Sequence, residues 1–369
     1  MNKEDQEDSS ENGELEEFNI SPNFEYEEDI VDDAENTFAL IDSFEAFTSI
    51  KDGKSYIIYQ NKTSKDLEVL KILKNKYKLV ATIKGHKEYI TSIKYFLNEN
   101  KNKEYLISSD YNSYIIITNI TEDFKEKCAF KAEFDNGQIS CCLMIFKLNN
   151  IIESDLENGL ILISSKNSQE NNKISLLSFI LGKDDKEIYK ADLIKLSNNT
   201  SYILYWDNKK SKKDYLIDIG YKKVEIVGIV DNENYTIFPN ELETFHHCGF
   251  IYNDEKNKTD LLYITSIQSY VFAYDLYQKK KIQAIKTSST FDRLYSILQW
   301  NKNYIIVSNA TTPDIKVIDI QQGKYVGNNY IAHEDDFRCI RKIKHPKFGW
   351  CILTGGDDFS IKLYKPKSI

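Results

Sequence analysis

The segment LTGGDDFSIKLYK (353–365) decides the fold of this chain. An apolar strand end leads into a Gly-Gly-Asp-Asp turn, and after the turn Ile361 and Leu363 alternate with polar residues. Alternation with a period of two on both sides of a tight turn is typical of a half-buried β-hairpin. The segment therefore predicts two antiparallel strands.

The same hairpin pattern recurs six more times, which indicates a repeat architecture. Between the last residues of successive hairpins the spacing is 44 to 59 residues, close to one four-stranded propeller blade plus its loops. A four-stranded sheet that is apolar on both faces is not stable alone in water, so neighbouring sheets must stack on it. The six further hairpins are YQNKTSKDLEVLK (59–71), LISSDYNSYIIITN (106–119), ISSKNSQENNKISLLS (163–178), DIGYKKVEIVG (218–228), YITSIQSYVFAYD (263–275) and VSNATTPDIKVID (307–319).

We therefore expect an all-β fold, a seven-bladed β-propeller over residues 36–369. The last repeat holds only three strands, so NTFALI (36–41) is predicted to supply its fourth strand and to join the two ends of the ring. Residues 1–35 are expected to form a disordered acidic arm. The expected blades are 42–84, 85–135, 136–196, 197–240, 241–287, 288–331 and 332–369.

The repeats resemble those of the WD40 β-propeller family in a degenerate form. In the last repeat Ala332-His333 stands for Gly-His and Tyr364-Lys365 for Trp-Asp, while the second repeat keeps Gly85-His86. The one literal Trp-Asp pair, Trp206-Asp207, falls at the end of a first strand and is not a repeat signature. The resemblance implies a buried polar network within a blade, made of His333, Thr354, Asp358 and Tyr364 in the last repeat and of His86, Ser108 and Asn112 in the second, with Thr118 at the Trp position.

Composition and motifs argue against catalysis and against membrane insertion. No nucleophile elbow, zinc-protease motif or phosphate-binding loop is present, and no apolar run approaches the roughly 18 residues that span a bilayer. The six cysteines lack CxxC spacing, and His246, His247 and Cys248 alternate between strand faces, so no metal or cofactor is expected. We expect an intracellular protein, cytoplasmic or nuclear, that is not an enzyme.

A candidate partner-binding site lies where the innermost strands begin, on the top rim of the ring. The chain has only three arginines, and Arg293 and Arg338 both fall at this position in adjacent blades. Residues two apart share a strand face, so Arg293 should project with Tyr295, and Arg338 with Asp336; Tyr89 and Thr91 are the matching positions in the second blade. Arginine beside tyrosine is typical of an interface hot spot. The other interpretation is a local ion pair of Arg338 with Asp335 or Asp336.

A second candidate is a basic patch on two loops of neighbouring blades, which should open on the opposite, bottom face. Its residues are Lys209, Lys210, Lys212, Lys213, Lys279, Lys280 and Lys281. Such a cluster attracts polyanions, and membrane lipid, RNA and the acidic arm are candidates. A solvated lysine face without a ligand is the alternative.

Charge is distributed unevenly along the chain. Residues 1–35 carry fifteen acidic residues and one lysine, whereas the chain as a whole has a net charge of −9, so the body is mildly basic. The stretch 15–31 scatters aromatic residues among acids, which is compatible with a docking segment or with a solubilising arm. The sequence predicts a scaffold that binds protein partners as a monomer within a hetero-complex, with anionic membrane or RNA as the alternative partners.

Overall fold

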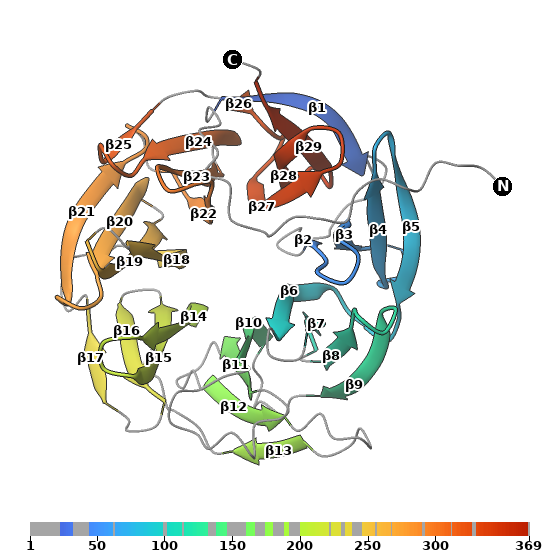
Figure 1. The fold of residues 1–369 in the computed structure, drawn as a ribbon, viewed down its shortest axis with the longest axis horizontal. Helices are drawn as coiled ribbons and strands as arrows, with labels where there is room; N and C mark the ends of the chain where they lie inside the picture. Colours follow the sequence, from blue (N-terminus) through green and yellow to red (C-terminus); the bar gives the residue numbers. More distant parts are fainter. Residues whose placement is uncertain are drawn as a thin grey trace.

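The fold is taken from a computed structural model. It describes residues 23–31, 44–61, 63–98, 102–112, 114–131, 138–145, 160–166, 174–179, 188–191, 200–220, 223–229, 233–237, 246–254, 257–266, 268–289, 292–310, 312–326 and 330–367. The described strands form seven antiparallel sheets arranged around a ring (Figure 1). The all-β propeller architecture is thereby confirmed.

Each sheet is a meander of consecutive strands, and we number the sheets in chain order. Sheet 1 holds β2 (Glu45–Thr48), β3 (Ser55–Gln60), β4 (Leu67–Leu73) and β5 (Lys76–Ile83). Sheet 2 holds β6 (Ile90–Asn98), β7 (Lys103–Asp110), β8 (Tyr114–Asn119) and β9 (Lys125–Lys131). Sheet 3 holds β10 (Gln138–Ile145), β11 (Leu160–Lys166), β12 (Ile174–Phe179) and β13 (Ile188–Ala191). Side chains are described in the other six sheets, and of sheet 3 only the strand pairing is described.

The second half of the chain continues the same order. Sheet 4 holds β14 (Thr200–Asn208), β15 (Lys213–Gly220), β16 (Val224–Gly228) and β17 (Asn234–Thr236). Sheet 5 holds β18 (His246–Asp254), β19 (Thr259–Ser266), β20 (Tyr270–Asp275) and β21 (Lys280–Lys286). Sheet 6 holds β22 (Leu294–Gln299), β23 (Tyr304–Asn309) and β24 (Asp314–Asp319), with β25 (Lys324–Tyr325) and β26 (Tyr330–Ile331) both paired to β24. Sheet 7 holds β27 (Phe337–His345), β28 (Gly349–Gly356) and β29 (Ile361–Pro366).

The strand that completes sheet 7 is β1 (Phe24–Val31), not 36–41 as the sequence predicts. It pairs antiparallel with β29, from Phe24 opposite Pro366 to Val31 opposite Ile361. The ends of the ring therefore do meet, but through a segment assigned to the disordered arm, and residues 36–41 lie outside the described part of the chain. Figure 1 shows β1 along the outer edge of sheet 7, beside β29.

The acidic sequence of β1 is compatible with a strand because its charges find partners. Lys365 lies 3.3 Å from Glu25 and also pairs with Glu27, and the Tyr77 hydroxyl of β5 donates a hydrogen bond to Glu28 (2.6 Å). Phe24 is fully buried and packs edge-on against Trp300 of sheet 6, with ring centroids 4.9 Å apart. The strand thus contacts sheets 6, 7 and 1 together.

The core lies between sheets, not within them. Five apolar clusters among the described side chains are each shared by two neighbouring sheets. One of them, for example, joins Ile58 and Val69 of sheet 1 to Ile93 and Leu106 of sheet 2. The six sheets whose side chains are described therefore bury apolar faces against their neighbours, as expected of a repeat architecture in which neighbouring units stabilise one another.

Candidate functional site

The ring has two faces that differ in which strand connections they carry. At the top face the second strand of each sheet turns into the third, and the innermost strand begins. At the bottom face the first strand turns into the second and the third into the fourth. The arginine candidates lie on the top face and the lysine candidates on the bottom face, as their positions on the strands predict.

On the top face the arginine candidates of sheets 6 and 7 come together. Arg338 Nε lies 3.0 Å from both carboxylate oxygens of Asp357, and its Nη2 donates to Asp357 Oδ2 at 2.6 Å. The same Nη2 is 3.0 Å from Asp336 Oδ2. The guanidinium also lies over the Tyr295 ring, 4.2 Å from its centroid. We call these residues together with Arg293 the arginine rim.

The contacts of Arg338 correspond to the local ion pair, with one partner that the sequence analysis missed. Asp336 is one partner, and the main partner is Asp357, at the turn between β28 and β29. A charge paired twice and stacked on a ring is held in one geometry. The guanidinium of Arg338 is therefore fixed in the rim by Asp336, Asp357 and Tyr295.

Arg293 differs from Arg338 because its side chain is exposed. It stands immediately before β22, and contact with the Tyr295 hydroxyl raises the pKa of its guanidinium. Burial, with the like charges of Asp357 and Asp335, raises the pKa of Asp336 although Arg338 favours its charged form. The rim thus presents a permanent cation beside a partly buried carboxylate.

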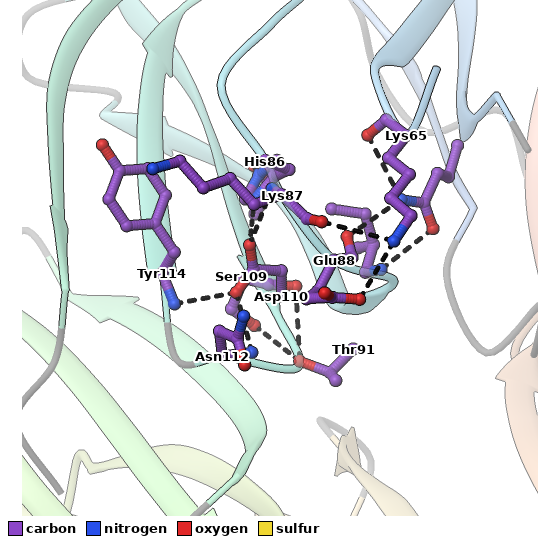
Figure 2. A network of polar contacts seen from close by, with 12 residues as sticks. Lys65, His86, Lys87, Glu88, Thr91, Ser109, Asp110, Asn112 and Tyr114 are labelled. Carbon is purple, nitrogen blue, oxygen red and sulfur yellow. Dashed lines mark hydrogen bonds and ion pairs between the residues drawn. The ribbon is translucent and has the colours of Figure 1, made fainter. Parts of the chain in front are cut away.

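The matching positions in sheet 2 belong to a different local network (Figure 2). Tyr89 is 37% exposed and lies beneath the Lys65 ammonium, which pairs with Glu88 at 3.0 Å. The Thr91 hydroxyl lies 3.1 Å from Ser109 Oγ. These contacts lie within sheets 1 and 2, whereas the arginine rim belongs to sheets 6 and 7, so the six rim candidates fall into two groups.

In the last blade His333 contacts two of the three other residues that the resemblance implies, Thr354 and Asp358. His333 Nε2 lies 2.9 Å from Thr354 Oγ1, and His333 Nδ1 lies 2.9 Å from Asp358 Oδ1. The Tyr364 hydroxyl instead donates to the carbonyl of Ala332. A Cβ at Gly356 would lie 2.7 Å from the His333 ring, which explains the glycine at this turn.

The second blade uses Asp110 where the sequence analysis assigned Asn112. His86 Nε2 lies 2.7 Å from Ser108 Oγ, and its Nδ1 lies 3.4 Å from Asp110 Oδ2 (Figure 2). Asp110 is the last residue of β7 and fully buried, and its carboxylate accepts the backbone N–H groups of Asn112 and Tyr114. Asn112 itself is exposed, because the turn carries it past the histidine.

Thr118 of β8, which stands at the family's Trp position, has no such network. Its hydroxyl is buried, and within the described part of the chain it has no hydrogen-bond partner. A buried hydroxyl without a partner costs free energy of folding. In the second blade His86 is therefore hydrogen-bonded, whereas the Thr118 hydroxyl has no partner among the described residues.

The two lysine loops lie side by side on the bottom face. Lys210 of sheet 4 lies over the Tyr277 ring of sheet 5 (3.7 Å), and Lys279 of sheet 5 lies over the Tyr235 ring of sheet 4 (3.8 Å). Lys209 pairs with Asp207, and Lys213 pairs with Glu233 at 3.0 Å. Lys212, Lys280 and Lys281 are exposed. The lysines of the two loops thus lie on one surface, and acidic side chains neutralise part of its charge.

Trp206 joins two sheets, although it is not a repeat signature. Its indole N–H donates to Asp260 Oδ2 of sheet 5 at 2.8 Å, and the Tyr277 hydroxyl donates to the same oxygen. Asp260 is one of the buried acids at the start of a second strand, as is Glu104, which accepts from Ser49 of sheet 1. Sequence reasoning missed these acids; their signal was an acidic residue at the start of an otherwise apolar strand.

The described part of the chain has neither a metal-binding cluster nor a membrane-spanning helix. Among the described residues no three His, Cys, Asp or Glu side chains gather as a metal site, and no helix is long and apolar enough to cross a bilayer. Cys248, Cys339 and Cys351 are buried, and burial raises the pKa of the Cys248 thiol to about 11. A thiol with so high a pKa is unreactive at neutral pH.

Comparisons with known proteins support the architecture. No family model matches the chain, and no curated protein matches it in sequence. Among solved structures, the chain is similar to a crystal structure described as BBS1N in complex with ARL6DN, soaked with lead (TM-score 0.62, 11% identity, 92% of this chain and 96% of the other). The same complex soaked with mercury gives a TM-score of 0.64 at 10% identity over the same shares. At this identity the likeness shows a β-propeller fold, and membership in the WD40-repeat family stays a resemblance.

Proposed function

We propose that this chain is a non-catalytic scaffold that binds a protein partner on the top face, at the arginine rim. The observation that carries the proposal is the fixed position of Arg338 between Asp357, Asp336 and the Tyr295 ring, beside an exposed Arg293. A preformed surface loses little entropy when a partner binds. The propellers that this chain resembles in fold were crystallised with a protein partner, which also favours a scaffold role.

The chemistry of the rim favours a partner that presents a carboxylate. Arg293 offers a planar group of donors that can hold a carboxylate with two hydrogen bonds, and Tyr295 gives it a rigid aromatic support. Arg338 is already engaged by two carboxylates through Nε and Nη2, so its proposed role is to hold Tyr295 in place. Arg293 and Tyr295 are therefore the contact residues, and Arg338, Asp336 and Asp357 are their supports.

Polyanion binding on the bottom face is the second candidate, favoured by the juxtaposition of the lysine loops of sheets 4 and 5. Lys210 lies over Tyr277 of sheet 5, and Lys279 lies over Tyr235 of sheet 4. Asp207 and Glu233 pair with Lys209 and Lys213 and weaken the positive field of the patch. The top rim therefore remains the better-supported site.

The test compares Arg293→Glu with Lys280→Glu, a reversal of the same kind on the opposite face. The tagged chain is purified from the cells that make it, and co-purifying proteins are identified by mass spectrometry, then tested with purified components. A hot-spot arginine should weaken binding by roughly 30-fold or more, since such residues are worth about 2 kcal/mol or more. Equal recovery of every partner with both variants would refute the proposed site.

A further inference from the structure

The position where β1 begins determines where the acidic N-terminal residues leave the ring. Phe24 pairs with Pro366, the last residue of β29, and the carbonyl of Asn23 accepts a hydrogen bond from the Lys367 N–H at 2.8 Å. The end of β29 is a third-strand end and therefore lies at the bottom face. Residues 1–22 consequently leave the ring at the bottom face of sheet 7.

Residues 1–22 and the bottom face carry opposite charge. The segment holds eight acidic residues and one lysine. The bottom turns and strand starts of sheets 4 to 7 carry exposed lysines. Six of them are Lys210, Lys258, Lys279, Lys280, Lys324 and Lys347.

These lysines lie along a continuous arc because the bottom ends of sheets 4 to 7 are bonded to one another. Trp206 of sheet 4 bonds Asp260 of sheet 5, and the Tyr252 hydroxyl of sheet 5 lies 3.5 Å from the carbonyl of Lys302 in sheet 6. Lys342 of sheet 7 donates to the carbonyl of Trp300 in sheet 6 at 2.6 Å. The arc thus runs from the exit of the arm to the lysine loops of sheets 4 and 5.

The arm is long enough to follow this arc. A segment of 22 residues spans roughly 70 Å when extended, at about 3.3 Å per residue, and about 26 Å on average as a flexible coil. Tethering at Asn23 keeps its charges near the face at high effective concentration. A weak electrostatic contact is therefore sufficient for docking.

We propose that the bottom face from sheet 7 to sheet 4 is a binding surface for acidic peptide, and that its occupant is residues 1–22 of this chain. The arm lies on the lysine arc by charge complementarity, with its base fixed by β1. Docking covers the basic patch and reduces its attraction for other polyanions. The inference does not rest on the function proposed for the top rim.

Zero-length carbodiimide crosslinking of the full chain, at low protein concentration, tests the inference. The reagent joins carboxylates to lysines in contact, and mass spectrometry identifies the joined residues. Crosslinks from Glu4 to Glu17 should fall on the six arc lysines and should decline at about 0.5 M NaCl, where the screening length is only about 4 Å. Crosslinks spread equally over lysines of the two faces would overturn the inference.

Two matched variants measure the contribution of the arc. Lys258, Lys280 and Lys324 are replaced by Gln in one, and the top-face lysines Lys84, Lys87 and Lys286 in the other; all six are exposed. A labelled peptide of residues 1–22 is titrated onto each variant, in a chain whose arm acids are replaced by Asn and Gln. Three lost pairs at about 0.5 kcal/mol each should weaken binding about tenfold in the arc variant only.

Equal affinity for the two variants overturns the inference, since the folded state of each is verified by thermal unfolding. A second outcome would also overturn the inference, because it would identify a polyanion and not the arm as the ligand of this face. If the arm forms no crosslinks while heparin protects the arc lysines from acetylation in the unmodified chain, the face is a polyanion site and not an arm site.

Discussion

Replacing Phe24 with Ala should open the outer edge of sheet 7. Phe24 is fully buried in the cluster between sheets 6 and 7 and packs edge-on against Trp300 at 4.9 Å. A buried Phe→Ala change costs about 3–5 kcal/mol, and the lower value applies because an edge strand can separate without leaving a closed cavity. About 3 kcal/mol corresponds to a roughly hundredfold increase in the open population of β1.

Hydrogen exchange of the peptide covering β1 measures this opening directly. The control is Tyr26→Ala on the same strand, because Tyr26 is 50% exposed and its contacts are the edge of the Tyr364 ring and a hydrogen bond with Asp29 of its own strand. The control should cost at most about 1 kcal/mol, less than a tenfold increase in exchange. If the two variants exchange at equal rates, or if β1 stays protected in Phe24→Ala, the anchoring role of Phe24 is wrong.

Three further changes test the networks described above. Thr118→Val removes a buried hydroxyl that has no hydrogen-bond partner among the described residues, and it should raise the free energy of unfolding by about 1 kcal/mol in a urea titration. Thr91→Val is the control, and a loss of stability in Thr118→Val would show that the hydroxyl does have a partner. Trp206→Phe removes the donor to the buried Asp260 and should lower the free energy of unfolding by about 2 kcal/mol. In a double-mutant cycle, Trp206→Phe should have little further effect once Asp260 is replaced by Asn, and additive effects would exclude the contact. Burial opposes the charge of Asp358, but its hydrogen bonds with His333 and the Glu334 N–H outweigh burial and hold its pKa well below the usual range. The stabilisation by Asp358 is therefore complete above about pH 4 and declines as the pH falls further. Asp358→Asn should lower the free energy of unfolding by about 2 kcal/mol at pH 7 and should weaken the loss of stability at acid pH, followed by circular dichroism. An unchanged loss of stability at acid pH would refute this.

The sheets were predictable because their signal is local. Each hairpin pairs neighbouring residues across a short turn, so the alternation around Ile361 and Leu363 is enough to place β29. The inner and outer strands then follow from the spacing. That Arg293 and Arg338 lie at the start of adjacent inner strands also followed from counting along the chain, whereas the contact of Arg338 with the Tyr295 ring was not predicted.

The closing strand was not predictable in the same way because its partner is distant and its pattern is irregular. Register shifts after Tyr26 and after Asp29 break the period-two alternation of β1. Averaged over the first 35 residues, the carboxylates of β1 gave the charge composition of a disordered segment. In the fold, Lys365 pairs with Glu25, and the Tyr77 hydroxyl donates a hydrogen bond to Glu28. Charge composition describes a free segment and cannot report partners that other strands supply.

The prediction of the polar contacts was wrong for a related reason. The side chain that makes the contact lies a short distance along the chain from the expected one. Asp110 replaces Asn112 because a carboxylate two residues earlier already reaches His86. Asp357 escaped notice because a turn explains an aspartate without any ion pair, and its partner Arg338 lies on another strand. Such pairings depend on rotamers across strands, which sequence spacing does not encode.

The closure of the ring by β1 also orders events during synthesis. β1 leaves the ribosome about 330 residues before β29, its only partner among the described strands, and at about 5–20 residues per second the wait lasts tens of seconds. An apolar strand left unpaired for so long would be prone to aggregate with other nascent chains. Charged side chains on an unpaired strand oppose such pairing, so we expect the glutamates of β1, two of which Lys365 later binds, to limit aggregation before the ring can close.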